Sequence, residues 1–111
     1  MNQTREILVR CRISRSSFSG ERVFRVAKSD GNEHIGVAPV HYFLTQNNEP
    51  LGERVPPKKG DQVPGWIQAL LIENGGDEAS VVFPGGEMAR VNLREVASQS
   101  PESICYVPVG S

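Results

Sequence analysis

Long apolar runs are missing from this sequence, in which apolar residues make up 38% of the chain and stand in short groups. A helix that crosses a membrane needs about 18 or more consecutive apolar residues, so we expect no membrane span. The N-terminal stretch MNQTREILVRCR also lacks the apolar segment and small-residue cleavage site of a signal peptide. We therefore expect a cytoplasmic protein that does not act at a membrane.

Cysteine is equally scarce, and Cys11 and Cys105 lie near opposite ends of the 111 residues. In a reducing compartment such thiols are usually free and half-buried, and sequence alone supports no disulfide between them. Zinc sites draw their ligands from close pairs such as C-x₂-C, and no such pair is present. We therefore expect no metal site and no cofactor.

Sequence motifs that carry catalysis are absent too. The serines of RSSFSGER at 15–22 stand outside any G-x-S-x-G elbow, and no helix that could bind phosphate follows the turns NGGDE and PGGE. Asp77 and Glu78 are adjacent carboxylates on a turn, where water solvates both and leaves neither suited to acid–base catalysis. His34 and His41 are expected on the solvent face or at the rim of strands. We therefore expect no catalytic residues and a protein that is not an enzyme.

Glycine and proline, in contrast, are abundant, with 11 and 8 residues. They divide the apolar residues into short alternating runs, and this pattern favours many short strands joined by turns. Asp30-Gly31 predicts a hairpin turn, because such turns need positive φ. The irregular segment 45–57 is the best candidate for a boundary. The ranges expected to form strands are 5–13, 21–27, 34–38, 40–44, 62–73, 79–83 and 87–91.

The segments beside these strands are less regular. Residues 14–20 predict a loop with Phe18 as its anchor, and 92–96 predict a single helical turn. Residues 62–73 could also form a short helix, since Gln, Ala and Leu are good helix formers. We prefer a strand there because the apolar residues show no clean 3.6-residue period. Residues 104–109 predict a terminal strand or a docked tail.

A layout of strands and glycine turns fills the second half of the chain. Lys59-Gly60-Asp61 precedes a long apolar run, a glycine turn, two runs joined by Pro84-Gly85-Gly86 and the stretch VNLREV at 91–96. Over about positions 57–97 this layout resembles the Src-homology-3-like and KOW-type small barrels. The resemblance implies a long first strand after KGD-x-V and a short 3₁₀ turn before the last strand. The chain lacks the aromatic ladder with which the signalling barrels bind polyproline, because only Trp66 stands in the middle of this stretch.

Strand length leads independently to a barrel. Strands of about five residues cannot bury both faces in an open sheet, whereas a curled sheet covers its edges and creates one core. We therefore expect an all-β protein with a small, partly closed SH3-like β-barrel at 58–97 and extra N-terminal antiparallel strands. Residues 1–57 either add strands to the same sheet or form a small companion layer, and 98–111 form a C-terminal strand or tail.

The net charge of −1 hides an imbalance between the two halves of the chain. Residues 1–60 carry ten Lys and Arg against six Asp and Glu, whereas 61–111 carry two against seven. The simpler account is that opposite charges attract across the fold, and the alternative is a basic surface that binds nucleic acid.

Nucleic-acid binding would use the basic first strands, with aromatic rings as stacking platforms. Glu6 and Glu21 interrupt this basic region, and the isoelectric point of about 6.1 is well below that of typical nucleic-acid-binding domains. This function is therefore the alternative rather than the first expectation. The residues that would carry it are Arg10, Arg12, Phe18, Arg22 and Arg25.

Protein–protein assembly is the commonest role of a small β domain without catalytic groups. Tyr42 and Phe43 are adjacent, so one of them must face away from the core, although a second small core under 45–57 explains them equally well. Trp66 stands in the middle of a strand, where tryptophan more often packs in the core than binds a partner. We expect a non-enzymatic binding or assembly module, such as a small bacterial accessory protein, that binds a protein partner or a second copy of itself. The candidate partner-binding residues are Tyr42, Phe43 and Trp66.

Overall fold

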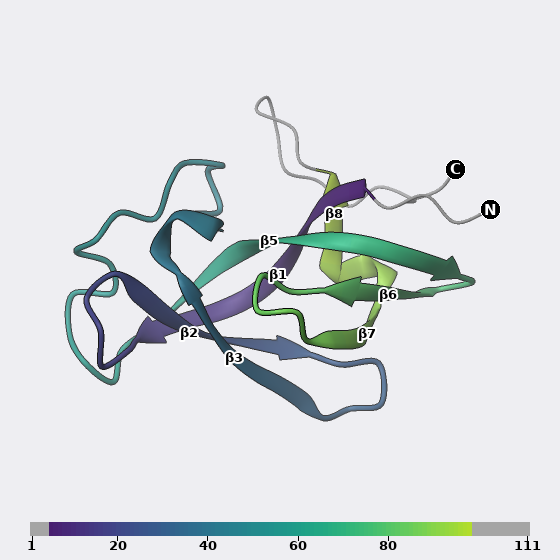
Figure 1. Cartoon of the computed structure of the whole chain (residues 1–111), viewed down its shortest axis with the longest axis horizontal. Coiled ribbons are helices and arrows are strands. Elements are labelled where there is room, and N and C mark those ends of the chain that lie inside the picture. The colour runs from purple at the N-terminus through teal and green to yellow at the C-terminus, as the bar shows by residue number, and fades with distance from the viewer. Residues whose placement is uncertain (1–4, 99–111) are drawn as a thin grey trace.

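The computed structural model describes residues 5–98, which form one twisted sheet that curls on itself (Figure 1). The predicted segment 104–109, with Cys105, lies outside the described residues. Within 5–98 the helical elements are two 3₁₀ turns of three residues each, and neither could cross a membrane. In chain order the elements are β1 (Arg5–Arg15), β2 (Glu21–Ala27), β3 (Glu33–Pro39), η1 (Val40–Tyr42), β4 (Phe43–Leu44), β5 (Gln62–Gly75), β6 (Glu78–Val82), β7 (Met88–Asn92), η2 (Leu93–Glu95) and β8 (Val96–Ser98).

The two long strands β1 and β5 form the centre of the sheet. They pair antiparallel along 5–14 and 62–71, within the strand order β3-β2-β1-β5-β6-β7. The short strand β8 returns to pair with residues 7–9 of β1, so the sheet nearly closes into a barrel. This confirms the predicted all-β fold, with a partly closed small barrel and extra antiparallel strands from the N-terminal part.

The barrel is not built from 58–97 alone. Both β5 and β8 pair with β1, so a strand from the start of the chain is an integral part of the barrel wall. The strands β2 and β3 continue the same sheet beyond β1, which matches the first of the two alternatives for residues 1–57. Residues 62–75 are a strand rather than a helix because the ladders to β1 and β6 pair their backbone groups.

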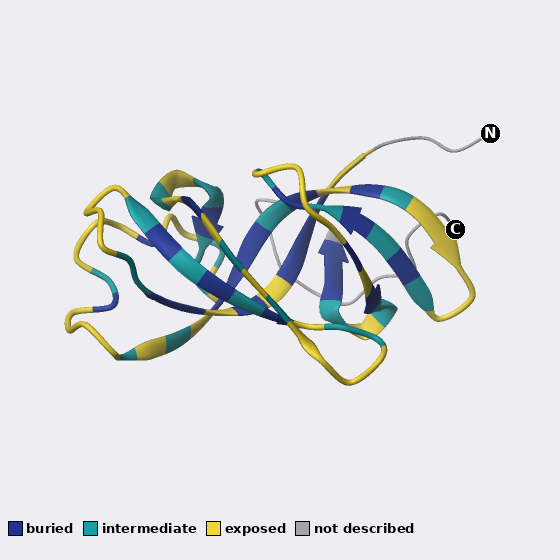
Figure 2. Ribbon diagram, turned by 60° about the horizontal axis from the view of Figure 1, so that its bottom comes forward, coloured by how far each residue is buried: buried dark blue, intermediate teal, exposed yellow. Residues whose placement is uncertain are grey.

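A single main core fills the inside of the curled sheet (Figure 2). From β1 it receives the alternating side chains of residues 7, 9, 11 and 13, as the period of two in a strand requires. Phe24 lies at its centre, with ring centroids 6.0 Å from Phe43 and 5.1 Å from Phe83. Burial of a large apolar side chain such as Phe24 stabilises the fold by about 1.5–3 kcal/mol.

A second, smaller core lies on the outer side of β1 and β5. It contains Leu8, Trp66 and Ala97, with Leu44 packed against them. Leu8 belongs to the outward-facing set of β1 but is fully buried, because β4 and β8 bring residues over this side of the sheet. Both faces of β1 are therefore covered near residue 8, and the outer face opens to solvent further along the strand.

Two local predictions were wrong. Residues 40–42 form the 3₁₀ turn η1 and only Phe43–Leu44 is a strand, because the β3 ladder ends at Pro39 and Val40 N–H donates to the carbonyl of Gly20. Phe18 does not anchor its loop, since 69% of its surface is exposed. The predicted helical turn at 92–96 is confirmed by η2.

Candidate functional site

Only one of the three candidate partner-binding residues reaches the surface. Phe43 is fully buried in the main core, and Trp66 is 7% exposed in the second core. Tyr42 is half-buried and packs against the main core from η1. The adjacent pair therefore divides as expected, with Phe43 inward and Tyr42 at the surface.

Tyr42 lies where β5 exchanges one neighbouring strand for another. On the edge of β5 opposite β1, β4 pairs with Trp66 and Ile67, and β6 pairs from Leu70 onward. Neither of these strands pairs with Gln68 or Ala69 on that edge. Tyr42 directly precedes β4, and the β6–β7 turn directly follows β6. The two segments therefore reach this interruption from opposite directions.

A pocket of about 340 Å³ opens at the interruption. Most of its lining residues are apolar and include Ala69, Phe83 and Pro84, together with Leu70, which is 39% exposed. Three lining residues have polar side chains, namely Tyr42, Gln68 and the exposed Glu6. A largely apolar hollow with a few polar groups is suited to hold a side chain of a ligand, because the polar groups fix its orientation.

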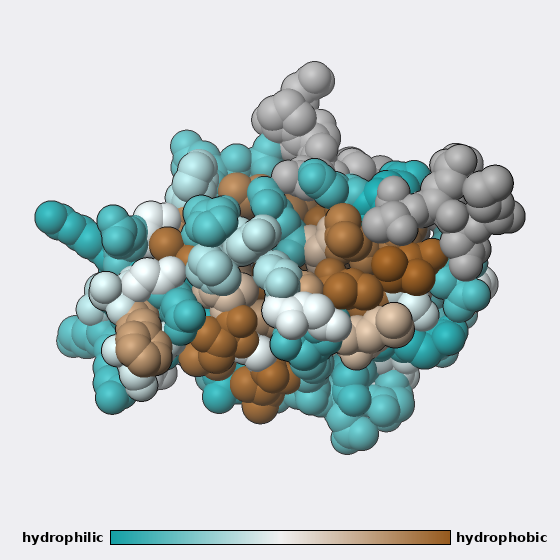
Figure 3. All heavy atoms as spheres, viewed as in Figure 1, coloured by the Kyte–Doolittle hydropathy of each residue, from teal (hydrophilic) through white to brown (hydrophobic). Residues whose placement is uncertain are grey.

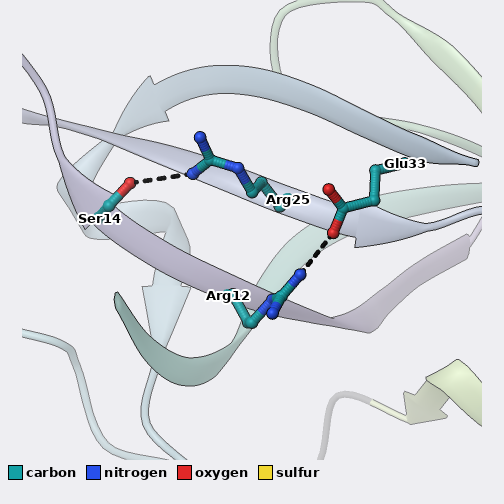
Figure 4. Close-up of polar contacts among 4 residues, drawn as sticks. All are labelled: Arg12, Ser14, Arg25 and Glu33. Atoms are coloured by element: carbon teal, nitrogen blue, oxygen red, sulfur yellow. Dashed lines mark hydrogen bonds and ion pairs between the residues drawn. The ribbon is translucent and has the colours of Figure 1, made fainter. Parts of the chain in front are cut away.

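The arginines of the first strands divide between the two faces of the sheet. Arg12 and Arg25 are direct cross-strand partners on β1 and β2, and Figure 4 shows them on one face with Ser14 and Glu33. Arg12 forms an ion pair with Glu33, while Arg25 donates a hydrogen bond of 3.4 Å to Ser14 Oγ. Like charges directly opposite each other are destabilising, and the carboxylate of Glu33 offsets part of that repulsion.

Arg10 completes this outward-facing group. Its guanidinium lies 5.2 Å from the ring centroid of Trp66, within the range of a cation–π contact. Arg10, Arg12 and Arg25 thus form a surface that we call the arginine face. On this face the carboxylate of Glu33 is paired with Arg12. Phe18 is exposed in the β1–β2 loop.

Arg22 is absent from the arginine face because it points into the protein. It is fully buried, and its guanidinium donates hydrogen bonds to four backbone carbonyls, of Ser19, Glu21, Glu53 and Val55. Arg22 is therefore not part of the exposed basic surface that the nucleic-acid alternative requires. The sequence contains a pattern that indicates this. Arg22 is two residues from the apolar Phe24 and therefore on the same face of a strand, whereas it is three residues from Arg25 and therefore on the opposite face.

The histidines and the described cysteine lie apart. His34 stacks on Phe83 at 4.9 Å, and its Nε2 is 3.9 Å from Glu87 Oε1, too far for a hydrogen bond. His41 is exposed, with its ring 4.5 Å from that of Tyr42. Cys11 is buried, and burial raises the pKa of its thiol. In residues 5–98 no three His, Cys, Asp or Glu side chains come together as metal ligands.

Sequence reasoning missed two groups of exposed apolar residues. Leu70 was placed on a strand, but its exposure depends on where β5 exchanges its neighbours. Ile35 and Val37 belong to the expected return strand, and they are 56% and 47% exposed because they lie on the outward face of β3. Figure 3 shows apolar atoms gathered at the surface over β3 and over β5 and β6. The sequence matches no protein-family model, and no curated protein and no solved structure matches the chain.

Proposed function

We propose that this chain is a non-enzymatic protein-binding module, and that the pocket beside Tyr42 receives an apolar side chain from a partner protein. The observation that carries the proposal is the largely apolar hollow at the interruption of the β5 ladder, whose lining includes the partly exposed Leu70 together with Tyr42 and Pro84. Pockets of this kind seat the few anchor residues that dominate the affinity of many protein interfaces.

Charge indicates the chemistry of the partner. Glu6 is one of the residues that line the pocket, and residues 61–111 carry seven acidic against two basic residues. A partner segment with an apolar anchor followed by Lys or Arg would place its charge near Glu6. The amide of Gln68 and the phenol of Tyr42 can exchange hydrogen bonds with the backbone of such a segment.

Selection from a displayed library of random peptides tests this proposal. We expect enriched peptides to contain an apolar residue next to a basic one and to shift the backbone resonances of residues 68–70 and 83–86. Tyr42→Ala should weaken their binding by about tenfold or more, because it removes one wall of the pocket. The matched control is Met88→Ala, which removes a 64%-exposed apolar side chain that does not line this pocket.

Two outcomes would contradict the proposal. The first is that a folded chain enriches no peptide at all. The second is that Tyr42→Ala and Met88→Ala leave binding equally unchanged, which would place the contact elsewhere. Circular dichroism of each variant separates a loss of binding from a loss of fold.

Nucleic-acid binding is the second candidate, and one observation favours it. Arg10, Arg12 and Arg25 share the arginine face, although Arg22 does not contribute and Arg12 is paired with Glu33. Attraction to phosphates is strongest at low salt. Fluorescence anisotropy of labelled single-stranded RNA and DNA should therefore rise at low ionic strength and fall as salt is added. An anisotropy that does not change at the lowest salt concentration eliminates this function.

A further inference from the structure

The strand β3 forms one edge of the sheet, and the residues in the middle of this strand carry no charge. In the described part of the chain β3 pairs only with β2, and its other edge has no neighbouring strand. Ile35 and Val37 point outward and are 56% and 47% exposed, with Gly36 between them. Natural sheets usually protect such an edge with charges, bulges or a proline. On β3 these devices are confined to the two ends, at Glu33 and Pro39.

Hydrogen bonds beyond the ends of β3 fix which of its backbone groups are free. Val40 N–H donates to the carbonyl of Gly20, and Lys28 N–H donates to the carbonyl of Asn32, both at 2.8 Å. Hydrogen-bonded and non-hydrogen-bonded pairs alternate along an antiparallel ladder. The backbone groups of residues 33, 35, 37 and 39 therefore point away from β2 and toward the free edge.

We propose that β3 pairs with β3 of a second copy of this chain, antiparallel and centred on Gly36. This register overlaps the whole of β3, Glu33–Pro39, in both copies. It sets Ile35 opposite Val37 of the partner subunit, and these two residues exchange both N–H···O bonds because all their free groups face the edge. The same contact occurs twice about the two-fold axis, as an isologous interface requires.

Side-chain chemistry favours this register over its neighbours. Centring on Gly36 places β-branched residues against each other, and with Val23 of β2, the cross-strand neighbour of Val37, they form one apolar cluster. A shift that centres the pairing on Ile35 would place Glu33 against Val37 of the partner subunit. A shift that centres it on Val37 would place Ile35 against Pro39 of the partner subunit, which has no N–H to donate, and would leave Glu33 beyond the end of the partner strand. In the Gly36-centred register Pro39 of the partner subunit faces Glu33 at the strand ends, so the missing donor lies outside the two central Ile35–Val37 pairs.

Charge is also compatible with a second copy as the occupant. In the Gly36-centred register Glu33 faces Pro39 of the partner subunit, so no like charges are directly opposed. Glu33 already has a cationic partner in Arg12. The interface is distinct from the Tyr42 pocket, because none of Ile35, Gly36 and Val37 lines that pocket. The two proposals can therefore fail separately.

Sedimentation of the full chain over a wide range of concentrations tests the pairing. We expect a monomer–dimer equilibrium, since dimer mass must rise with concentration. Ile35→Lys should raise the dimer dissociation constant by about tenfold or more, because it brings a charge to an apolar cross-strand pair. Met88→Lys, which alters an apolar residue on β7 that is 64% exposed, should leave the constant unchanged. Tyr42→Ala should also leave it unchanged.

Amide hydrogen exchange gives a second readout that does not depend on a substitution. The amides of Ile35 and Val37 should become more protected as concentration rises, whereas those of Gly36 and Ala38, which already face β2, should change little. A monomer at every concentration would overturn the proposal. So would a dimer that survives Ile35→Lys, or a dimer in which the amides of Ile35 and Val37 gain no protection.

Discussion

The Nε atom of Arg22 donates a hydrogen bond of 2.8 Å to the carbonyl oxygen of Val55, which lies 33 residues further along the chain. The same guanidinium binds the carbonyls of Ser19, Glu21 and Glu53, so one side chain on β2 joins two loops. A guanidinium suits this role because its donors are held in a fixed planar arrangement. The segment 45–57, which has little regular structure, is thus held against the sheet by a buried cation and neutral carbonyls.

Replacing Arg22 should destabilise the protein more than replacing any exposed arginine. Arg22→Ala removes the donor from four part-buried hydrogen bonds, and each carbonyl that water cannot then reach costs about 1–3 kcal/mol. We expect a loss of about 2–4 kcal/mol in the free energy of unfolding, and a similar direction for Arg22→Lys, whose ammonium cannot span the four oxygens. Urea denaturation of each variant measures this change in the free energy of unfolding. Arg94→Ala, at a side chain that is 80% exposed, should change the free energy by less than about 0.5 kcal/mol. Equal effects of the two variants would contradict this role.

Gly65 lies where β1 and β4 meet β5, and there is no room for a side chain. A Cβ atom there would stand 2.9 Å from the carbonyl oxygen of Leu44 and against Cδ1 of Ile13. We expect Gly65→Ala to lower the free energy of unfolding by about 1–3 kcal/mol, as overpacking does. Gly75→Ala is the matched control on the same strand, because no atom lies within 4 Å of a Cβ at that position. A thermal melt in which both variants behave alike would contradict the steric explanation.

Cys11 should make stability fall at alkaline pH. Burial raises the pKa of its thiol above the ordinary value of 9.0, so the unfolded chain loses this proton first as pH rises. Above about pH 9 the unfolded state then binds fewer protons than the native state, and stability declines. Cys11→Ala should show a smaller difference between the free energies of unfolding at about pH 8 and about pH 10. The comparison uses the change between the two pH values, because the substitution also leaves a cavity that lowers stability at both.

The same burial predicts slow chemical modification. In a Cys105→Ser background, Cys11 should react with a thiol reagent only as fast as the fold opens, since the protonated thiol is a poor nucleophile. Rapid labelling under native conditions would contradict the burial of Cys11. Labelling in denaturant is the positive control.

Trp66 is the single tryptophan of the chain, so its fluorescence reports on the contact with Arg10. The indole is 7% exposed, and we expect native emission at shorter wavelength than that of the unfolded chain. Arg10→Ala should shift the native emission toward longer wavelength and cost about 0.5–1 kcal/mol, the usual size of an exposed cation–π contact. Arg12→Ala, next on the same face but paired with Glu33, should leave the emission unchanged. An emission spectrum that Arg10→Ala does not alter would show that Arg10 does not cover the ring.

Local features of the fold were predictable because they depend on spacing along the chain. The apolar residues of 62–73 lack a helical period, and this stretch lies within β5. Spacing also separates Arg22 from Arg25, which stand three residues apart on β2 and therefore on opposite faces, although the predicted nucleic-acid surface includes both. The adjacency of Tyr42 and Phe43 required that one face outward, but not which one.

Features that depend on long-range pairing were not predictable in this way. The register of β1 on β5 joins residues more than 45 positions apart, and no local pattern specifies it. The pocket beside Tyr42 exists because β4 leaves β5 before β6 joins it, and η1 sets the point at which β4 begins. That β3 is an edge likewise follows from the absence of a further strand in the described sheet, and not from the letters HIGVA.

The pairing of β1 with both β5 and β8 has a consequence for the timing of folding during translation. The ribosome makes β1 well before two of its neighbours, because the strands that pair with residues 7–9 arrive only with residues 62–71 and 96–98. Contacts between such distant segments form slowly, because a long loop must close first. A nascent chain therefore carries the apolar side chains of Ile7, Leu8 and Val9 without these neighbours until residues 62–71 and 96–98 have been made, and uncovered apolar strands of this kind are prone to aggregate.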